Sequence, residues 1–419
     1  MQGDRSLWRD RDFRLLLSGQ TTSLLGAEVS TLALPLIAAL VLNASVMEIG
    51  VLAAAGSVPV MLAALPVGAI VDRSRKRPIM IVSNLVAASV MATVPLAALA
   101  GVLGMPQLYA VAFLAGLCEV FFGAAYQSYP PSLLGPDRLL DGNAKLATSM
   151  SLAVITGPIL GGGLITLLGA ARAVIADALS FLVSAVTVAL IRTPEPDPVP
   201  RPSGARLRTE IAEGLRYTLR HPLLRPVILS GAVCWFLLGG VHAIWTVYLV
   251  RELDWPAAVL GLVWGVSGVG GTLGGLLAAR LGERYGLPRV MLVARMVYPV
   301  TYVPLTLIGP GLAGQVLITI TFTIELMGDF IYNITQSSFR QLICPPELLG
   351  RMNATGRWLS WGSAPLGALL AGTLGTALGL HTTLVIFVVA LVSPALMLWL
   401  SPLRTLREVP VHESHLQTG

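Results

Sequence analysis

Long runs of apolar residues recur along the whole chain, and they constrain its fold more than any other feature. A helix that crosses a bilayer needs about 20 predominantly apolar residues, and twelve runs reach that length. Apolar, Gly-rich runs in this number favour a helical bundle over a barrel, whose strands would alternate with a period of two over about ten residues. The sequence therefore predicts an all-α polytopic membrane protein. The twelve predicted spans are 13–42, 47–71, 78–100, 106–130, 143–169, 171–191, 226–250, 257–280, 289–308, 311–339, 348–379 and 381–400.

Composition supports the same conclusion. The 419 residues are 55% hydrophobic and 12% charged, with a mean hydropathy of +0.76, whereas soluble domains carry about 25% charged residues. The first run is about 30 residues long, and the apolar region of a signal peptide is only about 7–15. We therefore expect the first run to be a membrane anchor and not a cleaved signal.

The positions of the 28 Lys and Arg residues predict the orientation. Basic residues gather before span one, after spans two, six and eight, around the connection between spans four and five, and at the C-terminal end. On the opposite side we find Arg172 and Arg251. Because cytoplasmic loops are enriched in Lys and Arg, both termini should be cytoplasmic, and we expect a multi-pass protein of the cytoplasmic (inner) membrane.

Several classes of function find no support in the sequence. The net charge of +6 is spread over loops that flank the spans, which suits a lipid bilayer and not a nucleic acid. Cys118, Cys234 and Cys344 have no paired spacing, so no metal site is implied. Lys76 and Lys145, the two lysines, do not follow glycine, which excludes a P-loop. We expect no cofactor and no enzymatic activity, and a monomeric chain.

The longest polar connection lies at the midpoint and divides the chain. Prolines alternate from 194 to 202 and predict an extended spacer, after which Ile211, Leu215 and Leu219 define one face of an amphipathic helix. The plain interpretation is a tether between two halves; a partner-binding role is the alternative. The predicted domains are an N-terminal segment 1–12, a six-helix half 13–191, a linker 192–225, a six-helix half 226–403 and a tail 404–419.

The two halves are copies of one another. With an offset of 210 residues, 119–144 aligns with 329–354 without a gap, and Glu119 falls on Asp329. With an offset of 211, Asp72-Arg73 falls on Glu283-Arg284. Both copies begin and end on the same predicted side, so they are parallel repeats of the kind found in rocker-type secondary transporters. A substrate path would lie between them.

Acidic side chains at membrane depth are the strongest functional clues, because each costs about 2.5–3.5 kcal/mol at a helix centre. Glu325 and Asp329 lie one turn apart on one face of span ten, where like charges disfavour simultaneous ionisation. Such a group suits proton exchange or a cationic substrate; structural pairing, for example of Glu119 or Asp329 with Arg295, Arg340 or Arg357, is the alternative. The candidate residues for proton coupling or substrate binding are Glu28, Glu119, Asp177, Glu325 and Asp329.

Three weaker signals accompany the acids. His242, inside span seven, suits a proton relay, although a polar contact is the favoured interpretation. Tyr332 and Trp358 are candidate cavity aromatics for stacking on an amphipathic substrate. The glycine-rich stretch 268–275 lies in an apolar span without a preceding strand, so it predicts close helix packing and not a dinucleotide loop.

The stretch GAIVDRSRKR at 68–77 resembles the signature loop of the major facilitator superfamily, in which a glycine, three residues, Asp-Arg and a basic cluster connect helices two and three. Gly68, Asp72, Arg73, Lys76 and Arg77 match, and Arg75 replaces the usual glycine. The resemblance implies that Gly68 packs closely against helix eleven and that Asp72 latches the outward-facing state. Glu283 and Arg284 form a weaker second copy of this latch.

The stretch ITGPILGGG at 155–163 resembles the antiporter motif of the same superfamily in helix five. Gly157, Pro158, Gly161 and Gly162 match. Pro158 removes a backbone donor and kinks the helix, while the glycines allow a neighbouring helix to approach. Packing and gating are equally compatible with this composition.

Segments 33–41, 133–144 and 177–185 resemble the macrolide-efflux and enterobactin-exporter branch of the superfamily. The arginine that many drug–proton antiporters carry in helix four is missing, since Glu119 is the only charged side chain of span four. The resemblance implies a secondary transporter that exports amphipathic small molecules, such as drugs, antibiotics or secondary metabolites, by proton antiport with alternating access. The alternatives are a facilitator or importer of a metabolite or siderophore, and a non-transporting membrane scaffold or sensor.

Overall fold

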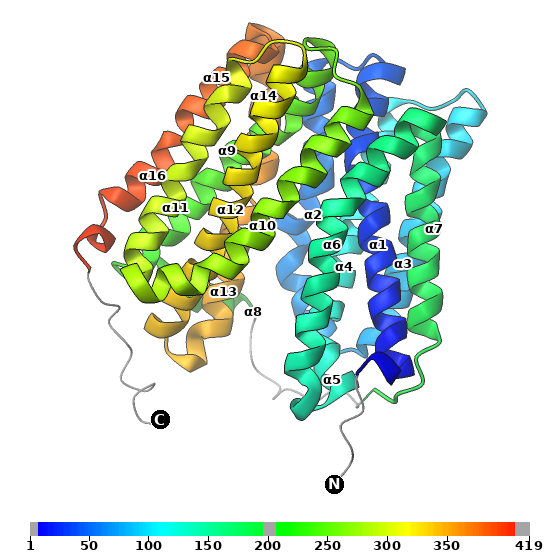
Figure 1. Ribbon diagram of the computed structural model, residues 1–419. Helices are drawn as coiled ribbons and strands as arrows, with labels where there is room; N and C mark the ends of the chain where they lie inside the picture. The colour runs from blue at the N-terminus through cyan, green and yellow to red at the C-terminus, as the bar shows by residue number, and fades with distance from the viewer. Residues whose placement is uncertain (1–6, 196–206, 407–419) are drawn as a thin grey trace. The chain divides into compact units, whose positions relative to one another are not determined.

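The computed structural model describes residues 7–195 and 207–406, and these are helical apart from short connections. Ten helices, counted within the described residues, are long and apolar enough to cross a membrane. Their positions confirm the all-α polytopic prediction (Figure 1). They are α1 (Arg11–Leu36, continued by η2, Ile37–Val41), α2 (Val46–Asp72), α3 (Lys76–Leu99), α4 (Met105–Ser128, followed by α5, Pro130–Leu134), α6 (Pro136–Leu168), α7 (Ala170–Ala189), α9 (Leu224–Arg251), α10 (Ala257–Tyr285), α12 (Leu312–Ile343), and the pair α15 (Leu380–Ala390) and α16 (Val392–Trp399).

The ninth and eleventh predicted spans are helical but interrupted. The ninth consists of α11 (Leu287–Tyr302) and the 3₁₀ turn η3 (Val303–Thr306), and the eleventh of α13 (Pro346–Trp361) and α14 (Ala364–Leu378). Pro304 and Pro365 lie at these two breaks and have no N–H to donate to the preceding turn. The continuous spans predicted at 289–308 and 348–379 are therefore each two shorter helical pieces.

Local sequence explains where the first helices begin. The carboxylate of Asp10 accepts from the backbone N–H groups of Asp12 and Phe13 at the start of α1. Ser45 and Glu48 form a capping box at the start of α2, in which each side chain accepts from the backbone of the other. Both arrangements satisfy donors that the first turn of a helix leaves without an intrahelical partner.

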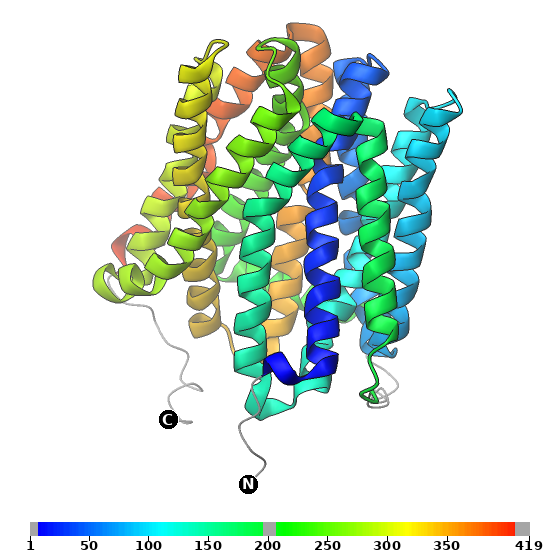
Figure 2. The ribbon, with the colours of Figure 1, turned by 45° about the vertical axis from the view of Figure 1, so that its right-hand side comes forward.

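The chain forms two compact units. The first comprises Met1–Pro202 with Trp255–Gly265, and the second comprises Ser203–Asp254 with Val266–Gly419. In the first, α1 packs on α6 and α7, α3 packs on α4 and α7, and α2 packs on α4 (Figure 2). In the second, α9 packs on α13, α14, α15 and α16, while α11 packs on α12 and α16.

These neighbour sets correspond through the internal repeat. Span one contacts spans five and six, and span seven contacts spans eleven and twelve; likewise span three contacts span four, and span nine contacts span ten. The prediction of two pseudo-symmetric six-helix halves is thus confirmed. Separate apolar clusters, one around Met80 and Tyr129 and one around Met291 and Phe339, are buried in the two units.

The glycine-rich stretch of α10 packs against α12. A Cβ on Gly270 would lie 1.9 Å from the carbonyl oxygen of Thr323, and one on Gly274 would lie 2.4 Å from that of Met327. Both distances are too short for any side chain, so these two positions require glycine. Close helix packing by this stretch is confirmed for Gly270 and Gly274, whereas a Cβ on Gly275 would meet no atom within 4 Å.

The second part of the linker is a helix, α8 (Leu207–Arg220), as expected. It packs on α13: Gly214 lies against the backbone of Arg351, and Arg351 forms an ion pair of 2.6 Å with Glu213. Thr218 of α8 is fully buried. The predicted proline-rich spacer falls mainly on 196–206, which lie outside the described residues.

Candidate functional site

The acid pair of span ten lies inside the second unit on α12. Glu325 is 8% exposed, and Asp329 is partly buried one turn further along the helix. The Tyr298 hydroxyl on α11 donates a hydrogen bond to Oδ1 of Asp329, and Nδ2 of Asn333 donates to the same oxygen over 2.8 Å. The packing of α11 on α12 therefore supplies a donor that the sequence of α12 alone does not contain.

Arg295 supplies the positive charge of this region. It is 4% exposed, its guanidinium lies 3.8 Å from the ring centroid of Tyr332, and it lies 5.5 Å from that of Tyr298. Its Nη1 donates to the sulfur of Cys234 on α9 over 3.1 Å. No ion pair within 4 Å joins Arg295 to Asp329 in the described part of the chain, so Tyr298 connects the two charges. The direct pairing considered from sequence is replaced by this indirect one.

His242 of α9 has the polar contact that the sequence favoured. Its Nε2 lies 3.4 Å from the Tyr302 hydroxyl on α11. Tyr302 and Trp245 both pack against Phe322 of α12, at 5.6 and 5.1 Å between ring centroids. Phe322 precedes Glu325 by one turn, so an aromatic layer lies next to the acid pair.

The acids of the first unit have different surroundings. Asp177 of α7 is 2% exposed, and the hydroxyl of Ser180 donates to its Oδ1 over 3.3 Å. Glu28 of α1 lies against Gly157, and Glu119 of α4 has an exposed side chain. The structure brings Glu325 and Asp329 together, as predicted from their spacing, and assigns Glu28, Glu119 and Asp177 to three separate helices.

The helix-five motif lies on α6 and faces α1. A Cβ on Gly157 would lie 2.7 Å from Cγ of Glu28, and one on Gly161 would lie 3.1 Å from Cα of Val29. Gly162 faces the carbonyl oxygen of Ala257 in the segment Trp255–Gly265 of the same unit. Pro158 lies inside the helix. These contacts provide a packing role; the gating role stays a prediction.

The loop motif 68–77 connects α2 to α3. A Cβ on Gly68 would meet no atom within 4 Å, so its expected packing against helix eleven stays a prediction. Asp72 is the last residue of α2 and Arg73 follows it as the C-cap; the side chain of Asp72 lies outside the described residues. Lys76 begins α3, and its Nζ donates to the Ser74 carbonyl over 2.9 Å.

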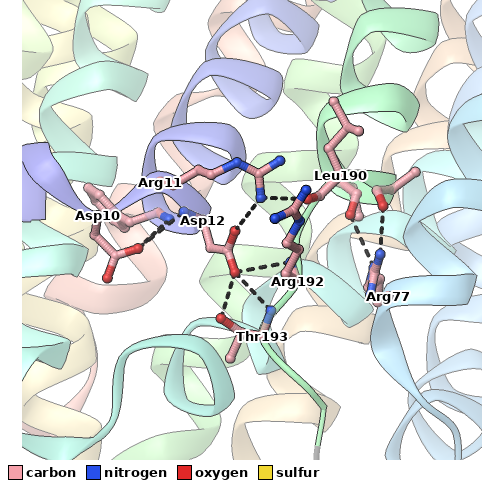
Figure 3. A network of polar contacts seen from close by, with 10 residues as sticks. Asp10, Arg11, Asp12, Arg77, Leu190, Arg192 and Thr193 are labelled. Carbon is pink, nitrogen blue, oxygen red and sulfur yellow. Dashed lines mark hydrogen bonds and ion pairs between the residues drawn. The ribbon is translucent and has the colours of Figure 1, made fainter.

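Arg77 and two acids outside the motif, Asp12 and Glu195, form a polar network at this end of the unit, and Figure 3 shows the contacts of Arg77 and Asp12. Nε and Nη2 of Arg77 donate to the carbonyl oxygens of Val188 and Ala189, at the end of α7. Glu195 accepts from the backbone N–H groups of Lys76 and Arg77, at 2.5 and 3.1 Å. The side chain of Arg77 is therefore tied to α7, and the backbone of Lys76 and Arg77 is tied to the start of the linker.

Asp12 is the second acid of the network, and sequence reasoning missed both it and Glu195. Its Oδ2 accepts from the backbone N–H of Arg192 at 3.0 Å and from the N–H and hydroxyl of Thr193 at 2.8 and 2.7 Å. Arg11 donates to the Leu190 carbonyl over 3.1 Å, as Figure 3 shows. An acid in the first turn of a helix is the signal for Asp12, whereas Glu195 lies 118 residues from its partner Arg77 in the sequence.

The remaining predicted residues lie in the second unit. Glu283 and Arg284 are exposed at the end of α10, the position that corresponds to Asp72-Arg73 at the end of α2. Tyr332 is 2% exposed beneath Arg295, and Trp358 is half-buried on α13. Tyr332 is thus engaged within the unit, and its role as a cavity aromatic stays a prediction.

The fold is that of a polytopic membrane protein built from two six-helix repeats, and comparison with known proteins identifies its family. The sequence profile of the Major Facilitator Superfamily matches residues 16–365. The chain is 28% identical over 348 residues to the multidrug efflux pump Tap of Mycolicibacterium fortuitum, covering 81% of this chain and 84% of that protein. It is 26% identical over 317 residues to the enterobactin exporter EntS of Citrobacter koseri, covering 73% of this chain and 72% of that protein.

A solved structure of a point mutant of the nucleoside transporter NupG has the same fold. The TM-score is 0.77 at 14% identity, over 93% of this chain and 98% of that one. The chain belongs to the Major Facilitator Superfamily, and it is a multi-pass secondary transporter of small molecules. The resemblance drawn from the two motifs is confirmed.

Proposed function

We propose that the protein exports amphipathic small molecules across the cytoplasmic membrane by alternating access, with a proton gradient as the driving force. Export is supported by the relatives, an efflux pump and an exporter. The observation that carries proton coupling is the cluster of Glu325, Asp329, Tyr298 and Arg295 inside the second unit. Acids at membrane depth are costly, and their usual roles include proton relays and ion pathways.

The substrate class follows from the relatives and from the aromatic residues. One relative is named for multiple drugs and the other for enterobactin. For this protein the proposed substrate is therefore an amphipathic small molecule. Trp358 and Tyr332 are the candidate aromatic contacts, and Glu28, Glu119 and Asp177 the candidate polar ones. Rings of this kind bind apolar faces and cations of a ligand.

The distribution of Lys and Arg supports the proposed orientation in the membrane. Both termini are cytoplasmic, because Lys and Arg gather on that side of the predicted spans. The halves 13–191 and 226–403 rock about a path between them, the linker 192–225 connects them, and the protein works as a monomer. Asp72, with Arg73, Lys76 and Arg77, latches one state, and Glu283-Arg284 is the weaker second latch.

Uphill efflux in everted membrane vesicles tests the proposal. Vesicles that contain the full chain receive a fluorescent amphipathic cation and an imposed pH gradient. Glu325→Gln or Asp329→Asn should abolish gradient-driven accumulation while the protein still inserts. Glu252→Gln, at the exposed end of α9, is the matched control and should transport like the parent. Full pH-driven transport by the double variant Glu325→Gln/Asp329→Asn would remove the pair from the mechanism.

Two further measurements separate the alternatives. Counterflow in proteoliposomes that does not respond to a pH gradient would identify a facilitator. A thermal-shift screen of purified protein against a compound panel at two pH values reports ligand and proton linkage together. A scaffold would show no shift with any compound and no dependence on the buried acids.

A further inference from the structure

The two acids of α12 differ in the hydrogen-bond donors around them. Oδ1 of Asp329 accepts from the hydroxyl of Tyr298 and from Nδ2 of Asn333. Two donors on one oxygen stabilise the ionised carboxylate more than the neutral acid, because a neutral carboxyl accepts more weakly. These two donors therefore compensate part of the cost of burying a charge on Asp329.

Arg295 adds a positive charge to the same side of the cluster. Its guanidinium packs on the rings of Tyr298 and Tyr332, and Tyr298 in turn donates to Asp329. A buried cation requires a compensating negative charge nearby. The sulfur of Cys234, to which Arg295 donates, is only a weak hydrogen-bond acceptor. Asp329 is therefore the carboxylate that compensates the positive charge of Arg295.

Glu325 lacks such donors. It is 8% exposed, and no hydrogen bond or ion pair reaches its carboxyl from the residues that the structure describes. The helix turn before it carries Phe322, which packs against Trp245 and Tyr302. An ionised carboxylate in such a place would be desolvated without compensation and would lie one turn from the charge of Asp329.

The helices around this cluster contribute these other titratable groups. From α11, which packs on α12, come Arg295, Tyr298 and Tyr302. From α9, which reaches α11 through side-chain contacts, come Cys234 and His242, whose Nε2 lies 3.4 Å from the Tyr302 hydroxyl. The part of α10 against α12 contributes Ser267, which donates to the Thr319 carbonyl, and the two close glycines. Within the described residues the cluster thus contains one buried arginine, Arg295, for two acids, Glu325 and Asp329.

We propose that the two acids divide the work: Asp329 is a permanent carboxylate held by Tyr298, Asn333 and Arg295, and Glu325 binds and releases the exchangeable proton. This inference rests on the proposed proton-coupled function and assigns its chemistry to one group. The neutral carboxylic acid of Glu325 loses one proton to water and becomes a carboxylate, and a proton from the opposite side restores it. Tyr298, Asn333 and Arg295 are positioning residues that keep Asp329 ionised throughout.

Infrared difference spectroscopy tests the assignment without any transport. The purified full chain in lipid is titrated with pH, and the carbonyl stretch of protonated carboxylic acids is followed. Glu325→Gln should remove a titrating buried band that Asp329→Asn retains. Glu28→Gln and Glu119→Gln are controls that should also retain it. Loss of the band in Asp329→Asn and its persistence in Glu325→Gln would overturn the proposal.

Two further measurements test the same assignment if Glu325→Gln or Asp329→Asn fails to fold. Isotope-labelled glutamate in the unmutated protein should shift the titrating band, and isotope-labelled aspartate should leave it in place; the opposite pattern overturns the assignment. Tyr298→Phe removes a donor from Asp329 and should add a second titrating band, which the aspartate label then shifts. An unchanged titration in Tyr298→Phe would remove the positioning role.

The outcomes also separate this inference from the proposed function. Titration of Glu325 in a protein that shows no pH-driven efflux would overturn proton-coupled export and leave the division between the acids standing. If the protein carries out uphill efflux but its titrating band survives in Glu325→Gln, proton-coupled export stands and the division between the acids is overturned.

Discussion

The two six-helix units share their helix contacts but not their buried chemistry. With the offset of 211, Arg295, Tyr298 and Tyr302 of α11 correspond to Asn84, Ala87 and Met91 of α3. With the offset of 210, Asp329 corresponds to Glu119. Asp329 has a tyrosine donor and a buried arginine, whereas Glu119 faces a helix that carries neither.

At the ends of the helices, the first unit has the polar network and the second unit lacks its counterpart among the described residues. In the first, Arg77 and Glu195 join the start of α3 to the end of α7 and the start of the linker, and Asp12 joins the start of α1 to the start of the linker. In the second, the corresponding Glu283 and Arg284 are exposed, and Arg284 contacts the ring of Tyr285. The two copies thus share a scaffold, while the buried cluster of an arginine with two acids occurs in the second copy and the polar network at the helix ends occurs in the first.

The largest expected difference concerns Arg295 and its counterpart. Arg295→Leu removes the positive charge that compensates Asp329 and should lower the free energy of unfolding by about 3–5 kcal/mol, the usual cost of leaving a buried charge uncompensated. Asn84→Leu removes the 2.8 Å hydrogen bond to Ser184 and should cost about 1–3 kcal/mol. Unfolding of the purified variants in mixed micelles measures both. Adding Asp329→Asn should recover part of the Arg295→Leu loss, and equal losses in the two units would contradict the asymmetry.

The corresponding acids should differ in transport. Asp329→Asn should eliminate pH-driven efflux, because it removes the carboxylate that balances Arg295. Glu119→Gln should slow efflux without eliminating it, since no described residue donates to Glu119 and the change leaves no cation without its partner. Initial rates in everted vesicles at matched expression provide the comparison. If Glu119→Gln were the more severe change, coupling would belong to the first unit.

The latch copies give a smaller expected difference. Asp72→Asn should impair transport more than Glu283→Gln, because the resemblance assigns the latch to the first copy. A charged contact at a protein surface contributes about 0.2–1 kcal/mol, so a several-fold change in the ratio of the two access states is the upper range. Cysteine accessibility from each side of the membrane reports that ratio. The reverse ranking would count against the latch.

The smallest expected effect lies at the start of the linker. Glu195 accepts from the first N–H groups of α3 as a capping residue does, so Glu195→Gln should lower the free energy of unfolding by about 0.5–2 kcal/mol. The corresponding second-unit helix, α11, has no side-chain cap at Gly286. Limited proteolysis of the linker should accelerate in Glu195→Gln. Proteolysis at the parent's rate would show that the contact does not hold the linker.

Residues close in sequence were predictable. Glu325 and Asp329 lie four positions apart, and the helical period alone places them on one face. The small-residue spacing of Gly270 and Gly274 likewise predicted the packing seen on α12. Asn333, four positions after Asp329, could have been found from the same helical period. Tyr298 could not, because its contact with α12 depends on the rotation of two helices about their axes.

The sequence by itself determined the class, the repeat and the approximate spans, because apolar length, periodicity and internal similarity are properties of the linear chain. Tertiary structure decided which charges meet. The indirect link between Arg295 and Asp329, the bare carboxyl of Glu325 and the capping of α3 by Glu195 all join helices that are distant in sequence. The free energy of a buried polar side chain depends on its hydrogen bonds and charge interactions with neighbours within a few ångströms. Only the packing of the helices sets those distances.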